Sequence, residues 1–345
     1  MPVRSFSSSK EKVVTVLVTG GAGYIGSHLA HALIEVGRDV TVLDNLSTGF
    51  ESFLPLDTAF YFGDCGDPNL LATLFSENDI EAIIHCAGSI IVPDSVADPI
   101  SYYLNNTAKS CALIESAVKH NVRTFIFSST AAVYGNAAGP IAEDAALNPA
   151  SPYGTSKMMT EIMLRDASRA YGLTYAALRY FNVAGADPLG RTGQALRRST
   201  HLIKVACQAA VGDRPGISIY GTNYPTPDGT CIRDYIHVSD LAQAHVAALN
   251  ALESVGRNLI LNCGYGRGCS VIEVVEAVKR VSGVDFSVQY LGRRSGDPPA
   301  VVACVDRIYG ELDWQPRYND LDTIVRHALD WERKIRHVDQ MQLAS

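Results

Sequence analysis

Short, almost wholly apolar runs alternate with helical patterns along the first 180 positions of this 345-residue chain. We predict strands for the β-branched runs at 13–19, 40–43, 60–62, 82–85, 124–128 and 175–179. Apolar residues recur with the period of a helix at 25–36, 102–119 and 153–170. Strands that are apolar throughout and alternate with helices are typical of a parallel sheet covered on both faces. The pattern therefore predicts an α/β domain with a doubly wound parallel sheet.

The organisation changes at the polar stretch 189–199, which predicts a loop. After it we predict helices at 200–211, 239–253, 270–281 and 320–333, and short strands at 217–220, 258–261 and 286–290. These elements indicate a smaller C-terminal α/β lobe. We expect a disordered tail at 1–12, a first domain at 13–188, and a second lobe occupying most of 189–338, with a return of the chain to the first domain left open. A cleft between the two is a natural ligand site.

Composition and charge narrow the class of protein. With 47% apolar and 19% charged residues the chain is an ordinary globular protein, and its net charge of −7 argues against a nucleic-acid partner. No apolar run approaches the ~20 residues that a membrane span needs. The eight cysteines are scattered without a Cys-x-x-Cys pair, so we predict free thiols and a cytoplasmic protein.

A glycine-rich turn follows the first predicted strand and opens the first predicted helix. Gly20, Gly23 and Gly26 form a Gly-x-x-Gly-x-x-Gly motif, one residue different in spacing from the commoner Rossmann pattern. Glycines permit a tight turn and close approach of the backbone, and the helix N-terminus faces a pyrophosphate. The motif predicts a dinucleotide site on a Rossmann-type sheet.

Acidic residues near the next strands indicate which dinucleotide is bound. Asp44 ends the second strand, 18 residues after Gly26, where a carboxylate can hold the ribose 2′-hydroxyl and repel a 2′-phosphate. NAD is therefore favoured over NADP. Asp64 follows the third strand and is predicted either to reach the adenine or to cap a helix before Pro68. Ala87 follows the fourth strand, where it suits a wall against the cofactor or a plain turn.

Tyr153 and Lys157 lie four residues apart in a predicted helix and so share one face. An ammonium beside a phenol favours the phenolate, which lowers a tyrosine pKa from its ordinary value near ~10. A tyrosine of that kind can exchange protons near neutral pH, as general acid–base catalysis requires. The pair predicts a catalytic tyrosine, although the spacing alone is not specific.

Together with Ser128-Ser129-Thr130, Val133-Tyr134-Gly135 and Asp44-Asn45, these motifs resemble those of extended short-chain dehydrogenases/reductases. Two longer strings, RYFNVAGA at 179–186 and YPTPDGTCIRDYIHV at 224–238, are similar to those of the UDP-glucose 4-epimerase family. The similarity runs from about residue 13 to about residue 333.

The resemblance implies an NAD-dependent enzyme that inverts C4 of a UDP-hexose through a transient 4-keto sugar. It implies a homodimer, in which the helices matching 102–119 and 153–170 pair, and it requires no metal. The implied catalytic residues are Thr130, Tyr153 and Lys157. The implied cofactor contacts are Gly20, Gly23, Tyr24, Ile25, Gly26, Asp44, Asn45, Asp64, Cys65, Ala87, Asn105, Tyr153, Lys157 and Tyr180. The implied substrate contacts are Thr130, Tyr153, Asn182, Leu202, Tyr220, Arg233, Arg294, Asp297 and Val301.

Two positions depart from the family pattern. Ile90 stands where the family often has a lysine near the nicotinamide, which puts one cofactor contact in doubt. Val301 stands where some members have a tyrosine beside the sugar 2-substituent. Because smaller residues there accompany N-acetylhexosamine substrates, we expect UDP-GlcNAc and UDP-GalNAc to be further substrates. The alternative is that valine only packs there.

Other functions stay open or are disfavoured by particular residues. A dehydratase of this fold has an acid–base pair after its threonine, whereas Ala131 and Ala132 follow Thr130 here. Epimerases acting on UDP-xylose, UDP-arabinose or UDP-glucuronate remain alternatives, as does a silent NAD-sensing regulatory protein. The set Asp234, His237 and Asp240 has helical spacing, but we interpret it as structural, with Ser239 as a helix N-cap.

Overall fold

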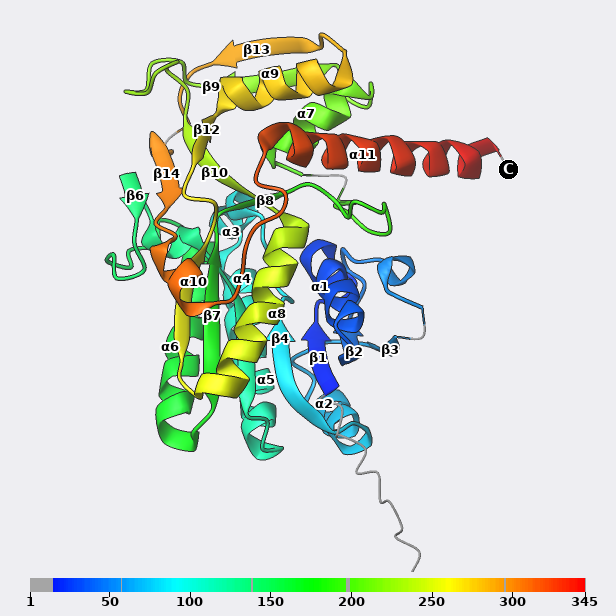
Figure 1. The fold of residues 1–345 in the computed structure, drawn as a ribbon, viewed down its shortest axis with the longest axis vertical. Coiled ribbons are helices and arrows are strands. Elements are labelled where there is room, and N and C mark those ends of the chain that lie inside the picture. Colours follow the sequence, from blue (N-terminus) through cyan, green and yellow to red (C-terminus); the bar gives the residue numbers. More distant parts are fainter. Residues whose placement is uncertain (1–14, 57, 138, 197–198, 295, 345) are drawn as a thin grey trace, which may run out of the picture.

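The computed structural model in Figure 1 describes residues 15–56, 58–137, 139–196, 199–294 and 296–344, and side chains as far as residue 337. The tail predicted at 1–12 lies outside the described residues. A larger lobe at the bottom of Figure 1 carries the N-terminal half, and a smaller lobe lies above it.

The larger lobe is built on a seven-stranded sheet in the order β11-β7-β5-β4-β1-β2-β3, and every neighbouring pair is parallel. Its strands are β1 (Thr15–Thr19), β2 (Asp39–Asp44), β3 (Ala59–Phe62), β4 (Ile80–His85), β5 (Thr124–Thr130), β7 (Thr174–Tyr180) and β11 (Leu259–Cys263). The first six lie where the apolar runs predict them. The predicted Rossmann-type α/β class is therefore confirmed.

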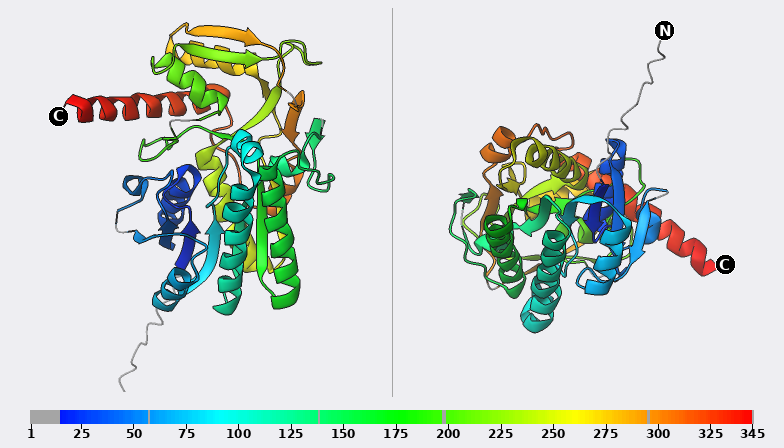
Figure 2. Two further views of the ribbon diagram at one scale, coloured as in Figure 1. Left: turned by 180° about the vertical axis from the view of Figure 1, so that it is seen from behind. Right: turned by 90° about the horizontal axis from the view of Figure 1, so that it is seen from below.

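Helices cover both faces of this sheet (Figure 2). On one face lie α1 (Tyr24–Glu35), α8 (Val238–Val255) and α10 (Asp306–Glu311), and on the other lie α2 (Pro68–Glu77), α5 (Lys109–Lys119) and α6 (Pro152–Tyr171). Because side chains alternate along a strand, Val16 and Val18 enter the first layer, whereas Leu17 enters the second. Both layers are buried, which explains why apolar residues occur on both faces of the strands.

The smaller lobe has its own core between three helices and short strands. Helices α7 (Leu202–Ala210), α9 (Val271–Ser282) and α11 (Leu321–Ala344) pack with the parallel pair β9 (Gly216–Tyr220) and β13 (Ser287–Leu291). A second sheet has the order β12-β10-β14-β6, with β8 also paired to β10. Its strands are β12 (Gly268–Ser270), β10 (Ile232–His237), β14 (Ala300–Ala303), β6 (Gly139–Ile141) and β8 (Asn182–Ala184).

The chain passes between the lobes more than once. Helix α8 and strand β11 come from the C-terminal half but complete the large sheet, where β11 pairs with β7. In the other direction, β6 and β8 leave the N-terminal half to join the second sheet. The predicted strand at 258–261 therefore corresponds to an edge strand of the large sheet. An apolar run predicts a strand but does not indicate which sheet it joins.

Local structure differs from the sequence prediction at several points. The helix predicted at 102–119 is divided into α4 (Pro99–Tyr102), a π-helical segment η2 (Tyr103–Ala108) and α5, after the short helix α3 (Val92–Ala97). Helix α11 extends beyond its predicted end at residue 333. Two single-turn 3-10 helices, η1 (Glu51–Phe53) and η3 (Ala131–Tyr134), follow β2 and β5.

Two predicted helix caps are also wrong. Helix α2 is capped by Asp67, whose carboxylate accepts hydrogen bonds from Asn69 N and Leu70 N, so Asp64 is not the cap. Helix α8 is capped by His237, whose Nδ1 accepts from Ser239 N at 3.0 Å, so Ser239 is not the cap. In each case, the side chain of another residue accepts the hydrogen bonds from the free N–H groups at the start of the helix.

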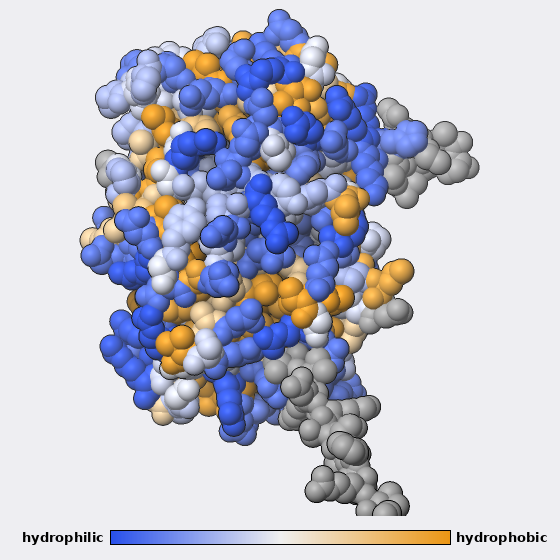
Figure 3. Space-filling view, viewed as in Figure 1, coloured by the Kyte–Doolittle hydropathy of each residue, from blue (hydrophilic) through white to orange (hydrophobic). Residues whose placement is uncertain are grey.

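The surface is mainly hydrophilic on the face shown in Figure 3, where hydrophilic residues cover most of both lobes and apolar residues lie between them. Among the residues that the structure describes, none of the helices combines the length and apolar character of a transmembrane segment.

Candidate active site

The turn after β1 has no room for a side chain at Gly20 or at Gly26. Gly20 has φ +69°, and a Cβ there would lie 2.6 Å from Ala87 N; a Cβ at Gly26 would lie 2.1 Å from Gly20 O. Gly23 is the N-cap of α1 and offers no side chain to its first N–H groups. These donors are therefore available to an anionic group, which fits a dinucleotide pyrophosphate. The turn also carries Tyr24 and Ile25, the first residues of α1.

Asp44 connects the second strand to this turn. Its Oδ2 accepts from Ala22 N at 2.9 Å and its Oδ1 accepts from Leu46 N at 2.8 Å. The buried carboxylate therefore shapes the glycine loop and places a negative charge at the end of β2. Asn45 forms a local turn, in which its Oδ1 accepts from Ser47 N at 3.1 Å. A carboxylate in this position is suited to a ribose hydroxyl rather than a phosphate.

Lys109 brings two predicted cofactor residues together. Its Nζ donates to Asp64 Oδ2 in an ion pair and to Asn105 Oδ1 at 2.8 Å. Asp64 Oδ1 also accepts from Gly66 N at 2.8 Å. The adjacent Cys65 is buried, and burial raises the pKa of its thiol to about 12. Lys109 thus connects the segment that follows β3, which contains Asp64, to the π-helical segment η2, which contains Asn105.

Asn106 is a site-forming residue that sequence reasoning missed. Its Oδ1 accepts from Ser89 N at 2.7 Å, and its Nδ2 donates to Ser89 O at 2.9 Å and to Ser156 Oγ at 3.1 Å. It therefore fixes the loop after β4, which contains Ala87, against α6. Its position in the π-helical segment η2 is typical of functional irregularities in helices. Ile90, in the same loop, is exposed.

The three predicted catalytic residues meet at the carboxyl end of β5. Thr130 is the last residue of β5, and Tyr153 and Lys157 lie in the first two turns of α6, which Ser151 caps. The Thr130 side chain lies close enough to the Tyr153 hydroxyl to influence its pKa. Lys157 is buried, its Nζ donates to Ser128 O at 2.9 Å and lies 4.9 Å from the centre of the Phe127 ring. The structure thus places the proton-transfer groups where a doubly wound sheet binds ligands.

The electrostatics of this group differ from the sequence prediction. Burial raises the pKa of Tyr153, and the Thr130 side chain acts in the opposite direction. The prediction of a lowered tyrosine pKa is wrong for this structure, because burial of Tyr153 raises its pKa. The Lys157 ammonium donates to Ser128 O. Burial lowers the pKa of Lys157 itself to about 8, so most of it still carries a proton at neutral pH.

Two predicted cofactor tyrosines make internal hydrogen bonds. Tyr180, at the end of β7, is buried and its hydroxyl is bonded to His245 Nε2 in α8. The Tyr24 hydroxyl donates to Gly185 O at 2.7 Å, which connects the glycine turn to the segment after β8. The Tyr180 hydroxyl is therefore bonded within the fold, whereas Tyr24 also lines a cavity of the smaller lobe.

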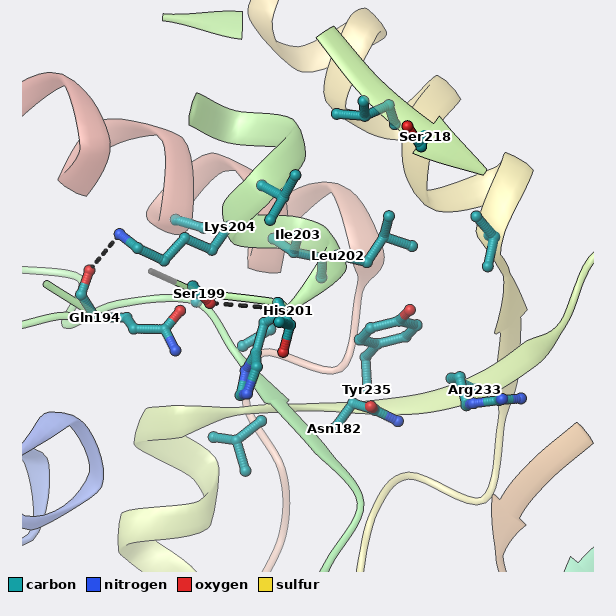
Figure 4. A pocket seen from close by; sticks show the side chains of 18 of the residues that line it. Asn182, Gln194, Ser199, His201, Leu202, Ile203, Lys204, Ser218, Arg233 and Tyr235 are labelled. Carbon is teal, nitrogen blue, oxygen red and sulfur yellow. Dashed lines mark hydrogen bonds between the residues drawn. The ribbon is translucent and has the colours of Figure 1, made fainter. Parts of the chain in front are cut away.

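A cavity of about 490 Å³ lies in the smaller lobe and opens toward the glycine turn. Figure 4 shows Arg233 at one end and Lys204 at the other, with Asn182 and Leu202 between them. Six of the predicted substrate residues line it: Asn182, Leu202, Tyr220, Arg233, Arg294 and Asp297. Residues from five segments far apart in sequence are thus brought together. The end at Lys204, which bonds Gln194 O at 2.7 Å and pairs with Glu332, was not predicted.

The two arginines of the cavity are held by neighbours. Arg233 Nη1 donates to Pro298 O at 3.0 Å, and its Nη2 lies 3.5 Å from Asp297 Oδ1. The Arg294 guanidinium stacks on the Tyr220 ring, 3.7 Å from its centre. Planar guanidinium groups in such positions are suited to phosphate oxygens.

Val301 does not line this cavity. It lies in β14 opposite Arg233 of β10, half-buried against the core that contains Tyr134 and Phe181. Because partners in a parallel ladder share a sheet face, a larger side chain at 301 would still lie beside Arg233.

Asp234, His237 and Asp240, which were interpreted as structural, form hydrogen bonds with other groups of the protein. Asp234 accepts from the backbone N–H groups of Tyr265, Gly266 and Ala303, and Asp240 accepts from the Tyr265 hydroxyl and from Arg317 N and Tyr318 N. The His237 Nε2 is 3.0 Å from His327 Nδ1. All eight cysteines are free thiols.

Comparisons with known proteins agree with this geometry. The model of the NAD dependent epimerase/dehydratase family matches residues 16–264. A UDP-glucose 4-epimerase of Azospirillum brasilense is 54% identical over 321 residues, which are 93% of this chain and 92% of that protein. The crystal structure of UDP-glucose 4-epimerase from Brucella ovis in complex with NAD is 44% identical, with a TM-score of 0.90, over 92% of this chain and 98% of that one.

A second solved structure, of the UDP-Glc/GlcNAc 4-epimerase from Campylobacter jejuni, is also 44% identical, with a TM-score of 0.83, over 93% of this chain and 99% of that one. The resemblance deduced from the motifs is confirmed. The chain therefore belongs to the NAD-dependent epimerase/dehydratase family, as a homologue of UDP-glucose 4-epimerases.

Proposed function

We propose that this protein is an NAD-dependent UDP-hexose 4-epimerase that interconverts UDP-glucose and UDP-galactose through a transient 4-keto sugar. The observation that carries the proposal is the meeting of Thr130, Tyr153 and Lys157 at the end of β5. The glycine turn follows β1 and Asp44 ends β2 of the same parallel sheet, and Tyr24 of that turn also lines the arginine-containing cavity. This arrangement supports a site that combines proton transfer, cofactor binding and nucleotide binding.

The residues have separate roles in this proposal. Tyr153 Oη, as the phenolate, takes the proton of the sugar 4-hydroxyl and later returns it, and Thr130 Oγ1 hydrogen-bonds the same oxygen. Lys157 supplies a positive charge that favours the phenolate. The glycine turn and Asp44 would hold NAD, which would supply a reversible hydride acceptor for C4. Arg233 and Arg294 hold the diphosphate, so that the keto sugar can turn while the nucleotide stays fixed.

An assay that couples UDP-galactose turnover to UDP-glucose dehydrogenase tests the proposal. The epimerase step is run without added NAD and quenched, and the UDP-glucose formed is then measured with the dehydrogenase. We expect activity, because a cofactor that is regenerated in every turnover can remain bound. UDP-GlcNAc, UDP-xylose and UDP-glucuronate serve as alternative substrates in parallel, and their epimers, which the coupling dehydrogenase does not detect, are separated by chromatography. Turnover of none of the four sugars would favour a silent NAD-binding protein instead.

We further propose that UDP-GlcNAc and UDP-GalNAc are substrates, since Val301 is small and half-buried beside Arg233. Val301→Tyr is expected to lower kcat/KM for the N-acetyl sugars about 10- to 100-fold, because a bulky ring competes with the acetamido group for ~1–3 kcal/mol of contact. Activity on UDP-galactose should stay within about twofold. Separate initial rates on both sugar classes check this, and equal losses on both would contradict it.

The proposed assembly is a homodimer formed through the larger lobe. Exposed apolar side chains gather on the neighbouring helices α3, α4 and α6 and on η2: Val96, Ile100, Leu104, Met159 and Ile162. A monomer would leave these residues in contact with water, which favours burial against a second copy. Light scattering should then give twice the chain mass of 37.2 kDa.

We place the protein in the cytoplasm. The support is its eight free thiols, five of which are buried or half-buried within the two lobes' cores. A reducing compartment preserves such thiols.

A further inference from the structure

Three consecutive residues of β5 hold three consecutive turns of α6. Thr130 lies beside the Tyr153 hydroxyl and influences its pKa, Ser128 O accepts from Lys157 Nζ at 2.9 Å, and Ser129 Oγ donates to Glu161 Oε1. Residues 153, 157 and 161 are spaced by four and so lie on one face of the helix. The first two contacts involve proposed catalytic groups. The third involves Glu161, which contacts neither Tyr153 nor Thr130.

Glu161 is fixed from its other side by a guanidinium. Arg179 Nε donates to Glu161 Oε1 at 3.0 Å and Arg179 Nη2 donates to Glu161 Oε2 at 2.7 Å, which is a bidentate pair. Arg179 is 2% exposed and Glu161 is 5% exposed. A fork of two parallel hydrogen bonds fixes direction as well as distance. The pair therefore holds α6 to β7 as well as to β5.

The network continues from Arg179 toward the smaller lobe. Arg179 Nη1 donates to Tyr134 Oη at 2.8 Å and to Glu143 O at 3.0 Å, and the Tyr134 hydroxyl donates to Asn262 Oδ1 at 2.7 Å. Asn262 Nδ2 in turn donates at 2.8 Å to Ile141 O of β6, which belongs to the second sheet. One connected set of buried hydrogen bonds thus extends from the catalytic helix to the strands beside Arg233.

Stability alone does not account for such a pair. Desolvating two charges costs several kcal/mol per ion, and apolar replacements of whole buried pairs are often neutral or stabilising. What an apolar core does not supply is a directed contact that fixes how far α6 lies along β5. Because Tyr153 and Glu161 are on the same rigid helix, a shift at residue 161 is transmitted to the Tyr153 hydroxyl.

We propose that the Glu161–Arg179 pair is a positioning device, which sets where α6 lies along β5 and therefore where the Tyr153 hydroxyl lies relative to Thr130. The expected change in kcat rests on the proposed epimerase function, whereas the expected change in the Tyr153 titration does not. The residues act through α6 and touch no reacting group.

The test is a double variant, Glu161→Leu with Arg179→Met, which removes both charges and leaves the core apolar. We expect a folded protein with kcat lowered about 10- to 100-fold, as for a misplacement of about 1 Å, and KM within twofold. The control is Arg38→Met with Glu253→Leu. It removes another bidentate Arg–Glu pair, which ties the start of β2 to α8 on the opposite face of the sheet. The control should retain wild-type kcat.

A second readout does not depend on turnover. Burial raises the pKa of Tyr153 and the neighbouring Thr130 acts to lower it, so a shift of Tyr153 away from Thr130 should raise the titration midpoint of this tyrosine. The midpoint is measured as the ultraviolet difference between each protein and its Tyr153→Phe counterpart. An inactive wild type together with a shifted midpoint would sink the epimerase function but support the positioning role. An active wild type with unchanged kcat and midpoint in the double variant would overturn the inference.

Two milder variants keep the inference testable if the double variant does not fold. Arg179→Lys keeps the charge but loses the fork, and Ser129→Ala removes only the contact from β5 to Glu161. Both are expected to lower kcat at least threefold with KM unchanged and to raise the Tyr153 midpoint. Native values of kcat and midpoint in both variants would show that the pair is structural only.

Discussion

Tyr153→Phe is expected to lower kcat by about 10²- to 10⁴-fold, the range that a single general acid–base group contributes. The ring keeps its place at the start of α6, but the hydroxyl beside Thr130 is lost. NAD should stay bound, because the glycine turn and Asp44 are unchanged. Single-turnover kinetics and the nucleotide content of the purified protein measure the two quantities separately.

A matched control for this variant is Tyr61→Phe. The Tyr61 hydroxyl donates to Glu77 Oε2 at 2.7 Å and accepts from Asn78 Nδ2 at 2.8 Å, at the far edge of the same sheet. Its loss is expected to leave kcat within about twofold. If Tyr153→Phe retained near-normal kcat, proton transfer would have to be assigned to another group.

The larger lobe could be predicted from sequence because its strands are buried on both faces. Runs such as 13–19 and 124–128 are almost wholly apolar, which is the signature of a parallel sheet under two helical layers. The glycine turn was equally legible, since Gly20 and Gly26 occupy positions where a Cβ would overlap backbone atoms. In both cases local sequence and tertiary structure impose the same requirement.

The path of the chain between lobes was not predictable in the same way. The edge strand β11 and the three-residue strands β6 and β8 are set by pairing with distant partners, such as Tyr180 with Cys263. The π-helical segment η2 is similar: it follows from the contacts of Asn106 with Ser89 and Ser156, which helical periodicity does not encode.

The site was predicted in part, and the parts differ in origin. Residues lining the cavity, such as Arg233 and Arg294, came from the family resemblance, and the structure brings them together. Arg179 begins one of the strings that carry the resemblance, but neither it nor Glu161 was predicted to be paired, because a glutamate on a helix and an arginine at a strand end are each ordinary. Only the fold shows that both are buried and paired. The burial of Tyr153 was likewise invisible, which is why the direction of its pKa shift was predicted wrongly.

Gly26→Ala is the second variant with a large expected effect, and it acts on cofactor binding rather than on proton transfer. The added Cβ would lie 2.1 Å from Gly20 O and 2.6 Å from Gly21 Cα. Both contacts are with backbone, which cannot rotate aside as a side chain can. The glycine loop must therefore move away from α1, which displaces the N–H groups that face the pyrophosphate. We expect the purified variant to retain less than about a tenth of the NAD of the wild type, because a loss of ~1.4 kcal/mol already lowers affinity tenfold.

The nucleotide released from the denatured protein measures this retention, and thermal unfolding with and without added NAD separates weak binding from misfolding. Overpacking of this kind costs ~1–3 kcal/mol of stability. Gly310→Ala is the control, since Gly310 lies in the exposed helix α10 with open space around its Cβ position. An alanine there should stabilise the helix by up to ~1 kcal/mol and leave NAD bound. Equal NAD content in both variants would mean that the cofactor does not depend on the close contact of Gly26 with the turn. The dinucleotide would then have to be held elsewhere along the sheet edge.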